Sequence, residues 1–74
     1  MDAYKIFSYL FNKIELSPLH KKLMIERFVH HKTFRECMET FGLTRERIRQ
    51  IEAKTLRKIR KYQDEHPDWM EELL

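Results

Sequence analysis

The chain has 74 residues, of which 42% are hydrophobic and 36% charged, with one cysteine, one glycine and a formal net charge of +3. A chain this short forms at most one domain, too small for a deep catalytic cleft, and its single cysteine cannot close an intramolecular disulfide. No apolar run reaches the roughly 20 residues of a membrane span and no signal peptide is present, so we expect a cytoplasmic protein without a membrane contact.

Leu, Ile, Lys, Arg and Glu are frequent, whereas Val and Gly occur once each. This composition favours helices over strands, so we predict a single all-α domain over residues 1–74, a bundle of four to five helices. The charge is uneven along the chain. Residues 45–61 hold eight basic and two acidic side chains, and residues 64–74 hold five acidic side chains and no Lys or Arg.

The first predicted helix covers residues 3–14, where apolar side chains recur at helical spacing. Further apolar residues, Tyr4, Ile6, Tyr9 and Phe11, widen this stripe until most of the helix is apolar. Such a helix needs cover on more than one side. Two interpretations remain open: an ordinary core helix with tyrosines tolerated at the surface, or a helix partly covered by another protein.

The second predicted helix runs from Pro18 to about Val29, and its expected buried face consists of Leu19, Leu23, Met24 and Phe28. Ser17 is a favourable N-cap, and proline at the first helical position loses no hydrogen bond. His30, His31 and Lys32 then form a short polar connection.

The third predicted helix runs from Phe34 to Phe41. Thr33 and Glu36 have the spacing of a capping box at its start. Gly42, the only glycine, follows its end and can adopt the positive φ typical of helix C-termini.

The fourth predicted helix is the longest, from Arg45 to about Gln63, with Thr44 as its cap. Its expected core-facing residues are Ile48, Ile51, Leu56 and Ile59. Pro67 interrupts the pattern, and a last short helical turn is expected to fold back on the body through Trp69, Leu73 and Leu74.

The third and fourth helices, joined by Gly42-Leu43-Thr44, have the pattern of a helix-turn-helix whose second helix is basic. Ile48 suits the apolar position that locks the two helices together. Met38 occupies a position that is usually small, so we expect its bulk to require a wider crossing or repacking of its flexible side chain.

Residues 43–60, LTRERIRQIEAKTLRKIR, resemble almost residue for residue the recognition helix of region 4 in primary bacterial sigma factors. Residues 7–14, 16–28 and 33–41 resemble the first three helices of the same region. The resemblance implies a transcription module that reads the promoter minus-35 element in the major groove of double-stranded DNA. It also implies that the first helices bind the flap of the RNA polymerase β subunit.

On this resemblance the chain divides into flap-binding helices (1–29), a helix-turn-helix (33–63) and an acidic C-terminal segment (64–74). Two departures stand out. The connection at residues 30–32 is shorter than in primary sigma factors, and the first helix is aromatic where the family is usually rich in Arg and Glu.

The resemblance assigns base reading to Arg45, Glu46, Arg49 and Gln50, at the helix end that enters the groove. Their chemistry agrees, because Arg pairs with guanine, Glu accepts from the cytosine amino group and Gln pairs with adenine. A carboxylate repels phosphate, so Glu46 would be a poor choice for purely electrostatic binding. Phosphate contacts are expected from Thr44, Arg35, Arg47 and Lys54.

Two further surfaces follow from the resemblance. Arg57, Lys58 and Arg60, together with Lys54, would face upstream activators, although a plain solvated helix face explains them equally well. The residues expected to contact polymerase or another partner are Tyr4, Phe7, Leu10, Phe11 and Leu23.

Two other functions remain open. The chain could be an interaction protein that binds RNA polymerase or a separate sigma subunit without reading DNA, which the aromatic first helix favours. It could also be a free-standing helix-turn-helix repressor, which would need a dimer to read two half-sites. Met1 to Tyr4 carry no tag, which favours a complete small protein, encoded by a phage or another mobile element, over an excised domain.

Catalysis and metal binding are not expected. His20, His30, His31, His66 and Cys37 lack the paired spacing of a metal site. No nucleophile with a base and no phosphate-binding glycine loop occurs, so we predict neither an enzyme nor a cofactor.

Overall fold

The computed structural model describes residues 2–74, which form five helices and no strand. The helices are α1 (Ala3–Lys13), α2 (Pro18–Phe28), α3 (Phe34–Phe41), α4 (Arg45–Glu65) and α5 (Trp69–Leu73). The predicted all-α class is therefore confirmed. No helix within residues 2–74 is long and apolar enough to cross a membrane.

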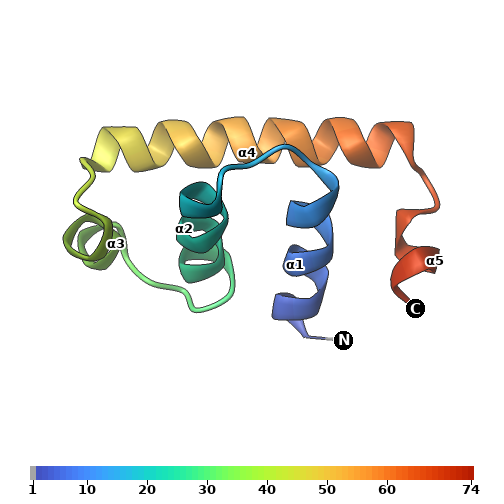
Figure 1. The fold of residues 1–74 in the computed structure, drawn as a ribbon, viewed down its shortest axis with the longest axis horizontal. Coiled ribbons are helices and arrows are strands. Elements are labelled where there is room, and N and C mark those ends of the chain that lie inside the picture. Colours follow the sequence, from blue (N-terminus) through green and yellow to red (C-terminus); the bar gives the residue numbers. More distant parts are fainter. Residues whose placement is uncertain (1) are drawn as a thin grey trace.

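The long helix α4 organises the fold. Figure 1 shows α4 along the whole length of the molecule, with α1, α2 and α3 on one side of it and α5 turning back at its C-terminal end. Helix α1 packs on α2 and α4, α2 packs on α3, and α3 packs on α4. The molecule measures 37 × 22 × 17 Å. Helix α3 thus lies at the N-terminal end of α4, and α1 and α5 lie toward the other end.

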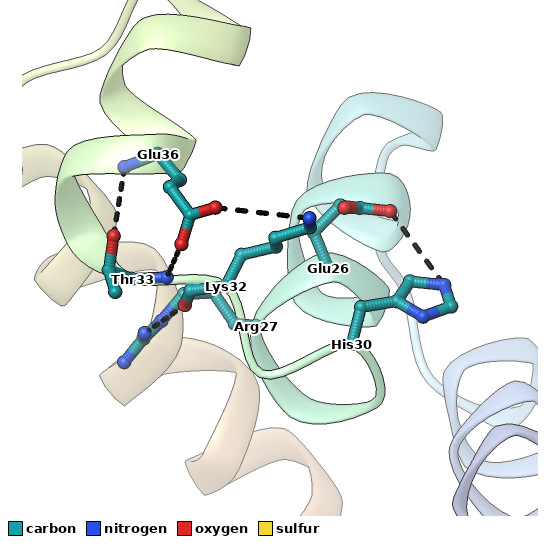
Figure 2. A network of polar contacts seen from close by, with 6 residues as sticks. All are labelled: Glu26, Arg27, His30, Lys32, Thr33 and Glu36. Carbon is teal, nitrogen blue, oxygen red and sulfur yellow. Dashed lines mark hydrogen bonds and ion pairs between the residues drawn. The ribbon is translucent and has the colours of Figure 1, made fainter.

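Side-chain caps begin the helices where the sequence predicts them. The Ser17 hydroxyl accepts the His20 N–H at 3.2 Å at the start of α2. Thr33 Oγ1 accepts the Glu36 N–H at 3.1 Å, and Glu36 Oε1 accepts the Thr33 N–H at 3.0 Å, so the predicted capping box is present (Figure 2). These hydrogen bonds hold the pKa of Glu36 below its usual value. The cap residues therefore fix the entry points of α2 and α3.

The core lies between α1, α2, α3 and one face of α4. Its buried members are Leu10, Phe11, Leu23, Met24, Cys37, Ile48, Ile51 and Ile59. Burial raises the pKa of the free Cys37 thiol, which keeps it protonated and unreactive. Two predicted core residues are wrong. Leu19 of α2 is 47% exposed, and Leu56 of α4 is 44% exposed, with Thr55 buried in place of Leu56. Ile48, Ile51, Thr55 and Ile59 follow the spacing of one helix face, whereas Leu56 lies about 100° further round the helix.

The C-terminal segment folds back as expected, with one exception. Trp69 packs against the core and Leu73 is buried, but Leu74 is 86% exposed. The Tyr9 hydroxyl donates to the Glu72 carboxylate and lies 3.3 Å from the Tyr62 hydroxyl. The contact with Glu72 is the main cause that raises the pKa of Tyr9. Two polar contacts of the Tyr9 hydroxyl thereby join α1 to α4 and to α5.

Arg27 at the end of α2 joins three helices. Its guanidinium forms an ion pair with Glu52 of α4. It donates through Nη1 to the Lys32 carbonyl at 2.6 Å (Figure 2). It also lies 4.1 Å from the ring centroid of Phe34, the first residue of α3. Because the Arg27 and Glu52 side chains are mostly buried, this contact fixes how α2 and α3 meet α4.

Candidate nucleic-acid interface

A tight turn connects α3 to α4. Gly42 adopts φ +65°, and its N–H donates to the Met38 carbonyl at 2.9 Å. Thr44 then caps α4 by accepting the Arg47 N–H at 3.1 Å. Ile48 is fully buried against the core, as predicted. Met38 is half-buried, so its side chain is accommodated at the edge of the core.

The four predicted base-reading residues lie together on the surface. Arg45, Glu46, Arg49 and Gln50 are all exposed, while the intervening Ile48 is buried. Their spacing (i, i+1, i+4, i+5) places them on one face of the first two turns of α4. A continuous strip of one basic, one acidic, one basic and one amide group therefore faces away from the body.

Glu46 and Arg49 bind each other within this strip. Arg49 Nη2 donates to Glu46 Oε1 at 2.6 Å, and Nε donates to Oε2 at 3.0 Å. Both side chains are more than 60% exposed. Arg49 is the main cause that lowers the pKa of Glu46, so the carboxylate is ionised at neutral pH. The strip is thus held in a defined charge state.

Arg45 is held differently. Its guanidinium carbon lies 4.9 Å from the ring centroid of Phe34 on α3. Within residues 2–74 Arg45 forms no ion pair with a carboxylate. Sequence reasoning missed this contact, because it depends on how α3 crosses the start of α4.

The predicted phosphate contacts are all available at the surface. Thr44, Arg35, Arg47 and Lys54 are exposed. Among the described residues, none of the three basic side chains is engaged in an ion pair. The Thr44 hydroxyl accepts a cap hydrogen bond but retains its own proton to donate.

A cavity of about 220 Å³ lies between the start of α2 and the middle of α4. Its lining includes Ser17, His20, Lys54, Thr55 and Lys58. Burial lowers the pKa of His20, and the charges of Arg47, Lys54 and Lys58 lower it further. Thr55 Oγ1 is buried there without a hydrogen-bond partner. The i, i+4 spacing of Lys54 and Lys58 indicates from the sequence that they share one face of α4. The position of His20 near that face depends on how α2 packs and could not be predicted from the sequence.

The three predicted activator-facing residues do not behave alike. Arg57 and Arg60 are exposed. Lys58 is half-buried, and its Nζ donates to the Glu15 carbonyl at 2.5 Å. Lys58 therefore ties α4 to the α1–α2 connection, and only Arg57 and Arg60 present free cationic groups.

The five predicted partner-binding residues differ in how far they are exposed to solvent. Leu10, Phe11 and Leu23 are buried in the core, and Phe7 is half-buried, with its ring 5.3 Å from that of Phe28. These side chains fill the space between α1 and α2, so they offer little surface to a partner in this conformation. Tyr4 is 58% exposed and lines a cavity of about 200 Å³ together with Ser8, Asn12, Lys21 and Ile25.

No group of three or more His, Cys, Asp or Glu side chains in the described part of the chain is arranged to hold a metal ion. His30 lies 3.8 Å from Glu26 at the end of α2, as Figure 2 shows. This contact joins the last turn of α2 to a residue just after it and brings no third ligand.

Comparison with known proteins agrees with this arrangement. The model of the family described as sigma-70, region 4 matches residues 15–61. Two curated relatives, both called RNA polymerase sigma factor SigA, come from a Bacillus species and from Listeria monocytogenes serovar 1/2a. Each is 66% identical to the chain over 29 residues, which are 39% of this chain and 8% of the relative. The chain thus matches only a small part of these relatives. No solved structure matches it.

Proposed function

The chain belongs to the sigma-70 region 4 family, and we propose that it reads a promoter minus-35 element in the major groove while docked on the flap of the RNA polymerase β subunit. The observation that carries the proposal is the exposed strip of Arg45, Glu46, Arg49 and Gln50 at the start of α4. A helix-turn-helix presents this end of its second helix to base edges.

The chemistry of the strip suits base reading. The guanidinium of Arg45 or Arg49 can donate two hydrogen bonds to O6 and N7 of guanine, and Gln50 can pair with adenine. Glu46 can accept from the amino group of cytosine. A carboxylate at the centre of a phosphate-binding face would lower affinity, so its presence supports selection between bases.

Docking on polymerase would explain how so small a module binds a promoter. Four candidate phosphate contacts, Thr44, Arg35, Arg47 and Lys54, supply little sequence-independent affinity. A second attachment on polymerase raises the local concentration of the reading helix at the promoter. We therefore expect weak binding of the chain alone and firm binding in the complex.

The test is a double substitution, Arg45→Ala with Arg49→Ala, in the complex of the chain with RNA polymerase. Arg57→Ala with Arg60→Ala is the matched control, because it removes the same charge from the same helix further from the strip. Footprinting on promoter DNA should show loss of protection at the minus-35 element with the first pair only. Unchanged protection with the first pair would refute base reading by α4.

A second function has support from α1. The exposed Tyr4 and its adjoining cavity of about 200 Å³ suit a protein that binds RNA polymerase or a separate sigma subunit without reading DNA. Tyr4→Asp should then abolish capture of polymerase, whereas Leu74→Asp, at another exposed hydrophobic residue, should not. If footprints at the minus-35 element are absent while capture depends on Tyr4, this second function replaces the first.

A further inference from the structure

We propose that Phe34 is a positioning residue for DNA reading, because its ring holds the guanidinium of Arg45 at the start of α4. The inference rests on the proposed function of the strip and adds a residue from outside the reading helix. Phe34 is the first residue of α3 and is half-buried. It has no polar group that could hydrogen-bond to DNA, and its proposed effect on DNA reading is exerted through Arg45.

The geometry provides the contact. The Arg45 guanidinium carbon lies 4.9 Å from the Phe34 ring centroid, within the range of an attractive cation–π contact. Arg45 is at the first position of α4, where a long flexible side chain would otherwise sample many rotamers. The contact restricts those rotamers before DNA arrives, which reduces the entropy lost on binding.

The manner of holding leaves the donors of Arg45 free. A ring face attracts the positive charge of the guanidinium group. It does not occupy the N–H donors that point outward in the guanidinium plane, so these donors stay available for hydrogen bonds. Arg49, in contrast, already donates hydrogen bonds from Nε and Nη2 to Glu46. Arg45 is therefore ready to donate to a base or phosphate at once, whereas Arg49 must first exchange a carboxylate for its DNA partner.

The ring contacts a second guanidinium group, that of Arg27, in addition to that of Arg45. Arg27 lies 4.1 Å from the same ring centroid and is paired with Glu52 of α4. It also donates to the Lys32 carbonyl, just before the Thr33 cap of α3. Because Glu52 neutralises Arg27, two guanidinium groups can share one ring with little mutual repulsion.

The experiment distinguishes the effect of the aromatic ring of Phe34 from the effect of its apolar volume. Phe34→Leu keeps an apolar side chain and removes the ring, and Phe34→Tyr keeps the ring. Binding of the 74-residue chain to a duplex selected by it from a randomised library is measured by fluorescence anisotropy at low salt. Phe34→Leu should weaken binding about two- to fivefold, and Phe34→Tyr should match the original chain.

A double-mutant cycle identifies Arg45 as the route of the effect. In the Arg45→Ala background, Phe34→Leu should cause no further loss. Proton NMR provides a readout that does not depend on DNA: the Arg45 side-chain δ protons should be shifted upfield by the ring, and Phe34→Leu should remove that shift. Circular dichroism confirms that each variant is folded.

Two results would overturn the inference in distinguishable ways. If Arg45→Ala weakens binding but Phe34→Leu does not, or if their effects add in full, Phe34 has no positioning role and the proposed reading strip stands. If Arg45→Ala itself leaves binding unchanged, the role of Arg45 in the proposed function fails together with this inference.

Discussion

Glu46 and Arg49 lie one turn apart on α4 and form a two-point ion pair, with Arg49 donating at 2.6 and 3.0 Å to the two carboxylate oxygens. The pair occupies the centre of the strip proposed to enter the major groove. In the free protein each group therefore masks the charge of the other.

Neutralising Glu46 should loosen sequence selection. With Glu46→Gln, Arg49 is released and a phosphate-repelling charge is lost, so we expect tighter binding to unrelated DNA and a smaller preference for promoter DNA. Anisotropy titrations on a promoter duplex and on a scrambled duplex measure this preference. Glu71→Gln on α5 removes the same charge far from the strip, and an equal effect from that control would show that only net charge matters.

The ion pair between Arg27 and Glu52 should be important for stability. Arg27→Ala leaves Glu52, whose side chain is only 15% exposed, without its partner, and we expect a loss of about 2 kcal/mol in the free energy of unfolding. Urea denaturation measures it. Arg35→Ala, at an exposed residue of α3, is the control, and Arg27→Met with Glu52→Leu should recover stability. A loss from Arg35→Ala as large as from Arg27→Ala would contradict this account.

The turn between α3 and α4 depends on the backbone of Gly42. A Cβ added there meets no atom within 4 Å, so the cost of Gly42→Ala comes only from its φ of +65°. We expect a loss of about 1–2 kcal/mol, and a smaller loss for Gly42→Asn, since Asn tolerates this conformation. Thermal denaturation of the two variants compares them, and equal losses would show that the conformation is not the cause.

Thr55 carries a buried hydroxyl with no partner. Thr55→Val removes the unpaired oxygen at similar volume, and we expect a gain of about 1 kcal/mol in stability. Thr55→Ser keeps the hydroxyl and loses the methyl group, so it should destabilise the fold. A destabilising Thr55→Val would indicate that the hydroxyl is hydrogen-bonded in solution.

Stability should fall as the pH falls through the titration range of His20. Burial and the neighbouring basic groups lower the pKa of folded His20, so the unfolded chain binds a proton more readily than the folded one. The contribution of neutral His20 is complete above the unfolded pKa of about 6.5 and is lost as the pH decreases toward the folded value.

An NMR titration of the His20 ring protons tests this directly. Lys54→Ala should raise the midpoint of His20, and Lys5→Ala on α1 should leave it unchanged. A midpoint at or above that of a free histidine would contradict the buried, electropositive setting of His20.

Local sequence signals predicted much of this fold, and tertiary contacts account for what they missed. The capping box of Thr33 and Glu36 and the turn at Gly42 depend on neighbouring residues and are confirmed. The exchange of Leu56 for Thr55 in the core was missed, because hydrophobicity alone suggested the apolar residue while the phase of α4 selected the polar one.

The candidate site divides in the same way. The exposure of Arg45, Glu46, Arg49 and Gln50 follows from helical spacing, but their contact with DNA stays a prediction. The contact of Arg45 with the Phe34 ring and the position of His20 near Lys54 both involve residues from separate helices, so no local sequence pattern could predict them. The burial of Leu10 and Phe11 likewise depends on how α1 packs against α2, whereas the burial of Leu23 was predicted from the apolar face of the second helix.

The unbroken length of α4 has a mechanical consequence. Its 21 residues extend about 31 Å at 1.5 Å per residue, with the reading strip at one end and α5 at the other. A tilt of about 10° applied near α5 would displace the opposite tip by about 5 Å, more than the 3.4 Å spacing of one base pair. A partner that binds the C-terminal end of α4 would therefore determine which base pairs the reading strip at its N-terminal end can reach.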